Sequence, residues 1–250
     1  MTSKSDMAYE TLKRDIIASR IPPDAPLRIQ SLGSSTGFGS TPVREALRRL
    51  ESEQFVISEA NFGFRVAPMS TELLQDLEAS RLVIETALLT DAMAQGDDKW
   101  EAELIAAHHR LKKGVLPIHT RNPDAITDWS QRHQGFHDAL LSASSYSTLK
   151  EFQRHISEQL ERHYFYTMTG ARRAVFEGGN DVKDVLADAL SLQRHTQLME
   201  AAIDRNTGMA AALLNDHIRL TSNVFSQLFA GGDRPDSDDR TDQSKQIVQT

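Results

Sequence analysis

One stretch of the sequence, Gly37 to Val56, restricts the fold most, because it reads as a short helix with one apolar and one cationic face. Thr41 can cap this helix through its hydroxyl group, and Pro42 suits the first helical position, where its missing N–H costs nothing. Such a helix can pack against a core and still present positive charge to a partner. The apolar residues at helical spacing are Val43, Ala46, Leu47 and Leu50, and the cationic ones are Arg44, Arg48 and Arg49.

A shorter amphipathic segment precedes this helix. Ile29 and Leu32 mark its apolar face, and it ends near Gly37, whose backbone readily takes the left-handed conformation of a tight turn. Two helices joined by such a turn predict a helix-turn-helix.

After the second helix, the spacing of apolar residues changes from a helical period to an alternating one. Phe55-Val56-Ile57 is a β-prone run, Asn61-Phe62-Gly63 is a turn candidate, and Phe64 and Val66 continue the alternation. The order helix, helix, hairpin is that of a winged helix-turn-helix, a DNA-reading unit, which we expect over residues 1–68. The competing interpretation is an amphipathic surface helix beside an unrelated hairpin.

The distribution of charge separates this unit from an acidic remainder. The net charge is −7, but residues 1–66 hold 9 Lys and Arg against 8 Asp and Glu, whereas the remaining residues hold 19 against 27. Because an acidic surface repels a phosphate backbone, a duplex is expected to meet only the N-terminal unit. The sequence shows no cysteine, no signal-peptide pattern and no membrane-spanning stretch, which predicts a cytoplasmic protein that does not bind a membrane.

From Ser70 or Thr71 onward the apolar spacing is helical. It predicts a C-terminal antiparallel all-α bundle of six to seven helices over residues 71–229, so that the fold as a whole is mainly α. Residues 169–180 are expected to form a loop, either a lid or a connector, and residues 230–250 a disordered tail. The longer helices are expected at roughly 124–143, 146–168, 181–204 and 207–229, with Phe152 and Met209 among their apolar positions.

Four histidines are predicted to meet inside this bundle. His133 and His137 stand four residues apart on one helical face, and His195 and His217 each lie in register with the apolar residues of a later helix. A single histidine on an apolar stripe is usually a core residue, but burying four unpaired imidazoles costs about 1–3 kcal/mol each, and a shared cation removes that cost. The remaining histidines lie on polar faces or in a loop and are expected to be solvated: His108, His109, His119, His155 and His163.

The ligand type indicates which divalent transition metal such a site holds. Imidazole nitrogen suits Zn²⁺ first, with Ni²⁺ or Co²⁺ as alternatives. Four neutral ligands leave the full charge of the ion in a low-dielectric cavity, which attracts a carboxylate. The residues between His133 and His137 lack the glutamate of an HExxH protease, so a binding site is the better interpretation and an enzyme is not expected. A direct transition-metal sensor and a metal-dependent hydrolase stay open as alternatives.

Several of these motifs resemble those of a known family. LRIQSLGSSTGFGSTPVREALRRLESEQFV and NFGFRVAPMS are similar to the winged-helix signature of the GntR family of bacterial transcription regulators. The resemblance covers roughly residues 8–229. Later segments resemble the effector-binding (FCD-type) helical domain of the FadR-like branch, namely RLVIETA at 81–87, HQGFHDALL at 133–141, RHTQLMEAAI at 194–203 and NDHIRLT at 215–221.

The resemblance implies a ligand-responsive homodimeric repressor that binds a palindromic operator in double-stranded DNA. By motif position, it implies that Arg44 contacts bases, with Ser40, Thr41 and Arg48 nearby. It also implies that Gly63 lies at the wing tip, in or near the minor groove.

The same resemblance implies the residues of the effector site. The effector would be a small carboxylate, and Arg81 is the candidate for gripping it. The metal ligands would be His133, His137, His195 and His217.

Two positions depart from the family pattern. Members commonly have Ser-Arg where this chain has Gly39-Ser40, so one base-reading arginine is missing. The operator sequence of this protein therefore cannot be inferred from those of its relatives. The first metal position is more often aspartate, and here it is His133, which removes one negative charge and favours nitrogen-preferring metals. The GFGSTP and HxxFH forms are most similar to the branch that includes the carbon-starvation-induced regulator of dicarboxylate and amino-acid breakdown.

Overall fold

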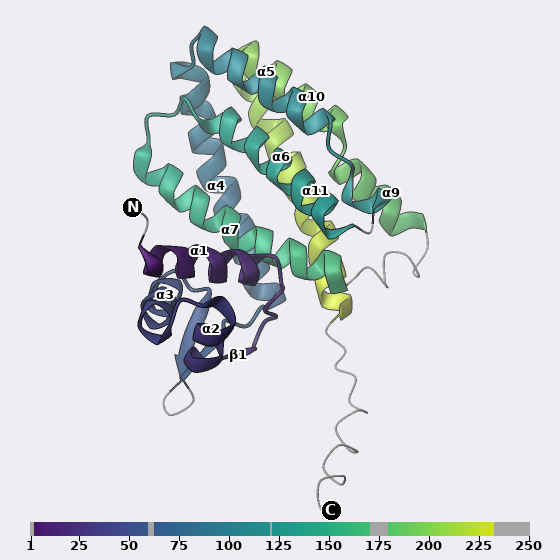
Figure 1. The fold of residues 1–250 in the computed structure, drawn as a ribbon. Helices are drawn as coiled ribbons and strands as arrows, with labels where there is room; N and C mark the ends of the chain where they lie inside the picture. The colour runs from purple at the N-terminus through teal and green to yellow at the C-terminus, as the bar shows by residue number, and fades with distance from the viewer. Residues whose placement is uncertain (1–2, 60–62, 121, 171–179, 233–250) are drawn as a thin grey trace, which may run out of the picture.

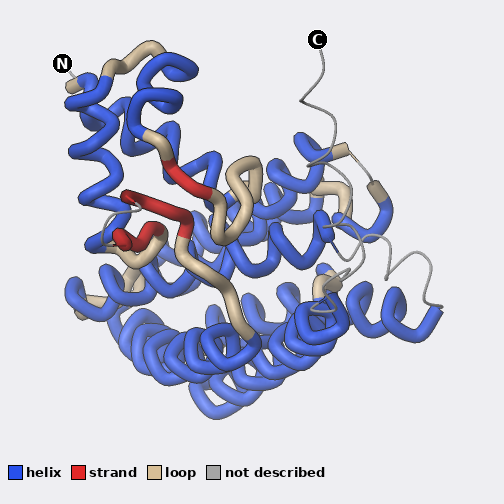
Figure 2. The backbone as a smooth tube through the Cα atoms, turned by 90° about the horizontal axis from the view of Figure 1, so that it is seen from below, coloured by secondary structure: helices blue, strands red, loops and turns tan. Residues whose placement is uncertain are grey.

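The computed structural model describes residues 3–59, 63–120, 122–170 and 180–232 (Figure 1). The described chain is mainly helical, as predicted, with a small N-terminal winged helix-turn-helix and a larger antiparallel helical bundle; its short strands lie together in the smaller part (Figure 2). Among the described residues, no helix is long and apolar enough to cross a membrane.

The N-terminal unit combines three helices with an antiparallel sheet of strand order β1-β3-β2. The predicted apolar face of its third helix is buried, because Val43, Ala46, Leu47 and Leu50 all pack into the core of this unit. The elements are α1 (Lys4–Ile17), β1 (Pro26–Leu27), α2 (Ile29–Thr36), α3 (Ser40–Ser52), β2 (Val56–Glu59) and β3 (Gly63–Val66).

Two glycines shape the turn between α2 and α3. Gly37 has a φ of 74° and Gly39 a φ of 84°, both in the left-handed region that favours glycine. α3 begins at Ser40 with Gly39 as its N-cap residue and no side-chain cap. The predicted cap by Thr41 is therefore wrong. Because the chain enters the helix earlier, Pro42 occupies the third helical position, where its missing N–H still removes no intrahelical hydrogen bond.

The wing contains one strand that the sequence does not reveal. β2 and β3 form the predicted antiparallel hairpin, and β1 adds to the other edge of β3, where Leu27 lies opposite Phe64. A two-residue strand beside prolines has no alternating pattern, so sequence reasoning misses it. Of the predicted turn, residues 60–62 lie outside the described part of the chain, and Gly63 begins β3.

The bundle begins where Ser70 caps its first helix, its hydroxyl accepting a hydrogen bond from the Leu73 N–H at 3.1 Å. This helix ends at Gly96, as predicted. The helices are α4 (Thr71–Gln95), α5 (Asp98–Lys112), α6 (Pro123–Leu141), α7 (Ser147–Gly170), α9 (Asn180–Ala189), α10 (Leu192–Ile203) and α11 (Thr207–Gly232), and η1 (Pro117–His119) is a short 3-10 helix.

The bundle differs from expectation at three positions. The helix expected over residues 181–204 is two helices, because Ser191 has an extended backbone that separates α9 from α10. Phe152 and Met209, expected at apolar inward positions, are 55% and 52% exposed. In α7 the other expected apolar positions lie on the buried side: Ile156 and Leu160 are buried and Leu149 packs against the core, so Phe152 alone departs from the expected stripe.

Two predicted segment boundaries also shift. α7 continues to Gly170 and α11 to Gly232, so helices extend into both the loop expected from residue 169 and the tail expected from residue 230. The rest of these two predictions falls on residues 171–179 and 233–250, outside the described residues.

The N-terminal unit contacts the bundle mainly through α7, along which α1 lies in Figure 1. The Nζ atom of Lys13 forms an ion pair with Glu158 at 2.8 Å. Gln159 donates from Nε2 to the backbone carbonyl of Glu53 at 2.9 Å, and the buried Arg162 donates to the carbonyl that follows β3. One helix of the bundle therefore holds both α1 and the wing region.

Candidate metal centre and DNA-reading surface

Four imidazole rings from three helices meet inside the bundle. α6 supplies His133 and His137, α10 supplies His195, and α11 supplies His217, and one ring nitrogen of each lies within 4.8 Å of those of the others. The ring centroids of His133 and His137 are 4.7 Å apart, and those of His195 and His217 are 4.8 Å apart. The structure therefore brings the four predicted histidines together in an arrangement that could hold a metal ion.

Unsatisfied ring nitrogens show that the cluster fits a cation. His133 Nε2, both nitrogens of His137 and His195 Nε2 are buried and have no hydrogen-bond partner in the described part of the chain. His195 Nδ1 lies 2.7 Å from the Ser191 carbonyl, a bond that fixes the proton on Nδ1 and turns the lone pair of Nε2 into the cluster. Each buried nitrogen without a partner costs about 1–3 kcal/mol, which a coordinated ion offsets.

The environment also keeps the rings neutral, the state in which imidazole binds metals. Burial is the main cause that holds the pKa values of His133, His137 and His217 well below the ordinary value of histidine, and neighbouring rings and Arg81 lower them further. Burial likewise lowers the pKa of His195 to about 4. The lone pairs are therefore available at neutral pH.

Arg81, predicted to grip a carboxylate, is buried on the inner face of α4. Its Nε donates to Glu85 Oε1 at 2.9 Å, and Gln153 Nε2 lies 3.3 Å from the same oxygen. Burial lowers the pKa of the guanidinium, but the Glu85 carboxylate and Tyr164 more than offset this and raise the pKa above the ordinary value. Arg81 is therefore a fixed positive charge in the bundle core.

A small cavity of about 40 Å³ lies between Arg81 and the edge of the histidine cluster. It is slightly larger than the volume of about 30 Å³ that one water molecule takes up in the liquid, so an organic ligand requires the surrounding helices to separate. Its lining comes from α4, α6 and α7 and consists of Arg81, Ser130, His133, Gln134, Ser157, Leu160, Glu161 and Tyr164.

Sequence reasoning missed two buried carboxylates near this cavity, Glu78 and Glu85. The Ser222 hydroxyl donates to Glu78, and burial raises the pKa of Glu78. The spacing of residues in α4 could have revealed them. Leu74, Glu78, Arg81 and Glu85 recur at helical intervals and therefore lie on one face of α4, and this face is buried although three of the four side chains are charged.

One of the histidines expected to be solvated is buried. His163 has no exposed surface, and its Nδ1 lies 2.8 Å from the Gln159 carbonyl. The expected buried face of α7, which includes Ile156 and Leu160, continues one helical turn further to His163. His163 is not part of the four-histidine cluster.

The residues expected to contact DNA form an exposed surface on α3. Ser40, Thr41, Arg44 and Arg48 are all exposed, and neither of these arginines forms an ion pair with any residue that the structure describes. Arg49 is different: its Nη1 pairs with Asp6 at 2.8 Å, and its guanidinium lies 3.8 Å from the centre of the Tyr9 ring. Arg44 and Arg48 are therefore the cations of α3 that are available to a partner.

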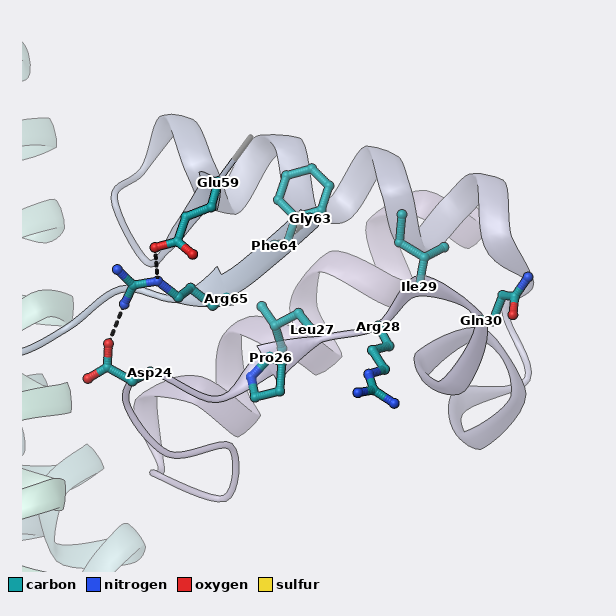
Figure 3. Close-up of a pocket in the computed structure, with 10 residues that line it drawn as sticks. All are labelled: Asp24, Pro26, Leu27, Arg28, Ile29, Gln30, Glu59, Gly63, Phe64 and Arg65. Atoms are coloured by element: carbon teal, nitrogen blue, oxygen red, sulfur yellow. Dashed lines mark hydrogen bonds and ion pairs between the residues drawn. The ribbon is translucent and has the colours of Figure 1, made fainter. Parts of the chain in front are cut away.

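An open groove of about 600 Å³ lies between the β1 strand, the start of α2 and the wing, and no α3 residue is among those that line it (Figure 3). Arg65 bridges Glu59 and Asp24 on one side of it, so its charge is neutralised within the protein. Arg28, at the start of α2, also lines the groove and forms no ion pair within the described residues, so it is a free cation in addition to Arg44 and Arg48.

Two family models together match most of the chain. The model of bacterial regulatory proteins of the gntR family matches residues 4–66, and that of the FCD domain matches residues 76–220. The chain belongs to the GntR family. It is therefore a DNA-binding transcription regulator with an FCD domain, and it is not an enzyme.

Individual relatives agree with this assignment. The HTH-type transcriptional repressor GlaR of Escherichia coli K12 is 32% identical over 231 residues, which cover 92% of this chain and 100% of the relative. An uncharacterized regulator, BphR of Paraburkholderia xenovorans LB400, is 30% identical over 89% of this chain and 85% of its own length.

Solved structures show the same fold. E. coli McbR/YncC superposes with a TM-score of 0.70 at 19% identity, covering 91% of this chain and 99% of that one. A GntR regulator from Rhodococcus sp. RHA1 gives a TM-score of 0.67 at 20% identity, over 92% and 99% of the two chains.

Proposed function

We propose that this regulator is a homodimeric repressor that a small carboxylate releases from a palindromic operator. The carboxylate binds beside a metal ion, Zn²⁺ in the first instance, held by His133, His137, His195 and His217. The observation that carries this proposal is the set of buried imidazole nitrogens without partners on three of these rings, close to the buried cation of Arg81. Similarity to a relative described as a repressor supports the direction of regulation.

In this proposal the N-terminal unit, residues 1–68, reads the operator and residues 71–229 sense the effector. α3 enters a major groove with Arg44 against base edges and Ser40, Thr41 and Arg48 beside it. The wing places Gly63 in or near the minor groove. A two-fold dimer then matches a palindrome, because each protomer reads one half-site.

The charges in the core explain why the effector should be an anion. Four neutral imidazoles leave the +2 charge of a bound ion uncompensated, and Arg81 adds a further positive charge that Glu85 balances. A carboxylate that enters the cavity meets this positive end. The free-energy cost of removing the carboxylate from water is offset by charge-assisted hydrogen bonds, which are stronger than neutral ones.

α7 gives a physical route from the effector to the DNA-reading unit. Ser157, Leu160, Glu161 and Tyr164 on one side of this helix line the cavity. Residues interleaved with them, among them Gln159, hold α1 and the wing region. A ligand that displaces α7 must therefore disturb the contacts that hold the N-terminal unit against the bundle. By reciprocity, operator DNA must weaken effector binding by the same factor by which the effector weakens operator binding.

The test compares metal-loaded with chelator-stripped protein on a duplex that the wild-type protein selects from random sequence. Small carboxylates are titrated against each complex, and DNA release is followed by fluorescence anisotropy. We expect at least one carboxylate to weaken operator binding by the loaded protein roughly 5- to 150-fold, and none to act on the stripped protein. If Zn²⁺ alone changes the affinity and no carboxylate adds to it, the protein is a direct metal sensor. A carboxylate response that survives stripping would remove the metal from the proposal.

Replacing Gln159 with alanine should weaken the coupling without damaging either site. The substitution removes the hydrogen bond to the Glu53 carbonyl, worth about 1 kcal/mol, so the change in DNA affinity caused by effector should shrink about fivefold. Metal content and effector affinity, measured by mass spectrometry and calorimetry, should stay at the wild-type values. Gln131→Ala, at an exposed position of α6, is the matched control and should leave the coupling unchanged. An unaltered coupling in Gln159→Ala would show that α7 is not the route.

A further inference from the structure

Two chemically different groups of residues line the cavity beside the histidine cluster, and we call them its two ends. Arg81 and the neutral His133 line the first end, where Arg81 and the proposed ion supply the positive charge that meets the effector carboxylate. Glu161 on α7 and Ser130 on α6 line the second end, and the Ser130 hydroxyl donates to Glu161 Oε1 at 2.9 Å. The second end presents a carboxylate and not a further cation.

Glu161 is a carboxylate whose negative charge no cation balances within the described residues. It forms no ion pair with any residue in the described ranges, and Ser130 is the donor that it has there. Burial raises the pKa of Glu161, the Ser130 hydrogen bond lowers it, and the nearby Glu158 and Asp138 raise it again. A desolvated carboxylate with one donor has capacity for further hydrogen bonds, and it faces the cavity.

We propose that the effector is a small carboxylate that carries a second group able to donate hydrogen bonds, a hydroxyl or an ammonium group. Its carboxylate lies at the Arg81 end and its donor reaches Glu161. This inference rests on the proposed function, because it assumes that the cavity is the effector site. It makes Glu161 a specificity-determining residue.

The two competing ligand classes fit the second end less well. An unsubstituted fatty acid leaves Glu161 buried without the partner that its desolvation requires, and sites built to pair a polar group reject analogues that lack it. A dicarboxylate places a like charge against Glu161 in a medium of low dielectric constant, which is unfavourable. A hydroxyl group donates a hydrogen bond to the Glu161 carboxylate as a neutral donor, and an ammonium group donates a charge-assisted one.

Such a ligand also couples to the reader. Its carboxylate is held by α4 and α6, whereas its donor is held by Glu161 of α7. The cavity of about 40 Å³ is too small for both ends of an organic acid, so binding must displace part of its lining, to which α7 contributes Ser157, Leu160, Glu161 and Tyr164. Because Gln159 on the same helix holds the N-terminal unit, the ligand's second group contributes directly to DNA release.

The test uses full-length, Zn²⁺-loaded protein and matched acids of three, four and five carbons. Each length is represented by the unsubstituted, terminally hydroxylated, terminally aminated and terminally carboxylated acid, and dissociation constants are measured by calorimetry. At the best chain length we expect the hydroxy or amino acid to bind about tenfold or more tightly than the unsubstituted and dicarboxylic acids, the effect of one charged hydrogen bond. Glu161→Gln should reduce this preference to less than about threefold, whereas Glu151→Gln, at an exposed position of the same helix, should leave it intact.

The outcomes separate this inference from the proposed function. If acids bind in an Arg81-dependent manner but the hydroxy, amino and unsubstituted forms bind equally, or the dicarboxylic acid binds best, the inference is overturned and the proposed function stands. If no acid binds, or if Arg81→Met leaves every affinity unchanged, the proposed function itself fails. The wild-type series decides the question even if Glu161→Gln does not fold, which its thermal melting curve reports.

Discussion

Replacing Arg44 with alanine should remove most of the preference for operator over random DNA. Arg44 is exposed near the start of α3 and has no ion-pair partner among the described residues, so its guanidinium is free for base edges. A bidentate contact from arginine to guanine contributes about 1–3 kcal/mol of discrimination. Since the proposed dimer makes the contact in both half-sites, the preference should fall roughly a hundredfold or more, as measured by anisotropy with operator and scrambled duplexes.

The same experiment distinguishes base reading from general attraction to phosphate. Arg110→Ala, on the exposed side of α5, removes the same charge from the bundle and should leave the operator preference unchanged. Arg44→Ala should keep wild-type metal content and thermal stability, because its side chain makes no contact in the core. If the variant weakens binding to operator and scrambled DNA equally, Arg44 only contacts phosphates and the assignment of α3 as a base reader through Arg44 is wrong.

The reading unit was largely visible in the sequence because its signals are local. The spacing of Val43, Ala46, Leu47 and Leu50 defines the buried face of α3 without knowledge of the rest of the fold. The start of α3 was misplaced because two glycines set the geometry of the turn, which leaves Thr41 inside the helix. Strand β1 depends on a partner distant in sequence, and two residues carry too little pattern to reveal it.

The clustering of the four histidines could be predicted for a different reason. Each of the four histidines lies on an apolar stripe of its own helix, and an antiparallel bundle turns all such stripes to one interior. The errors come from helices whose stripes are ambiguous. On α4 the buried face includes Glu78 and Glu85, and on α7 it includes His163, so rules that place charged and polar residues outside fail there. Which face of each helix is buried depends on partners far away in the sequence, such as Ser222 for Glu78. The local sequence pattern does not reveal these partners.

Glu161 illustrates the limit most clearly. In sequence it is one of several glutamates on a polar helix, and neither its spacing nor its neighbours distinguish it from Glu151 or Glu158. Its position against the cavity follows from the packing of α7 on α4 and α6. A specificity residue of this kind becomes apparent only when three helices are placed together.

Replacing His137 with alanine should abolish metal binding. His137 is 1% exposed, and both of its ring nitrogens are buried without a hydrogen-bond partner in the described chain. Loss of the ring therefore removes a predicted ligand and breaks no hydrogen bond of this ring within the described residues. Native mass spectrometry of the purified protein should show one Zn²⁺ per chain in the wild type and none in the variant. His109→Ala, at an exposed position of α5, should retain the metal.

Thermal stability then separates a metal ligand from an ordinary core histidine. Zn²⁺ at a free concentration a hundredfold above its dissociation constant stabilises the wild type by about 2.7 kcal/mol, which raises Tm by about 5–10 °C in a protein of this size. In His137→Ala that increase should vanish. In metal-free protein the substitution replaces a buried imidazole with a methyl group. The free energy no longer spent on desolvating the imidazole offsets part of the cost of the cavity that the substitution leaves. We therefore expect a much smaller difference in Tm between metal-free wild type and metal-free His137→Ala. If His137→Ala lowers Tm equally with and without Zn²⁺, the ring is a packing residue and the proposed effector site loses its positive centre.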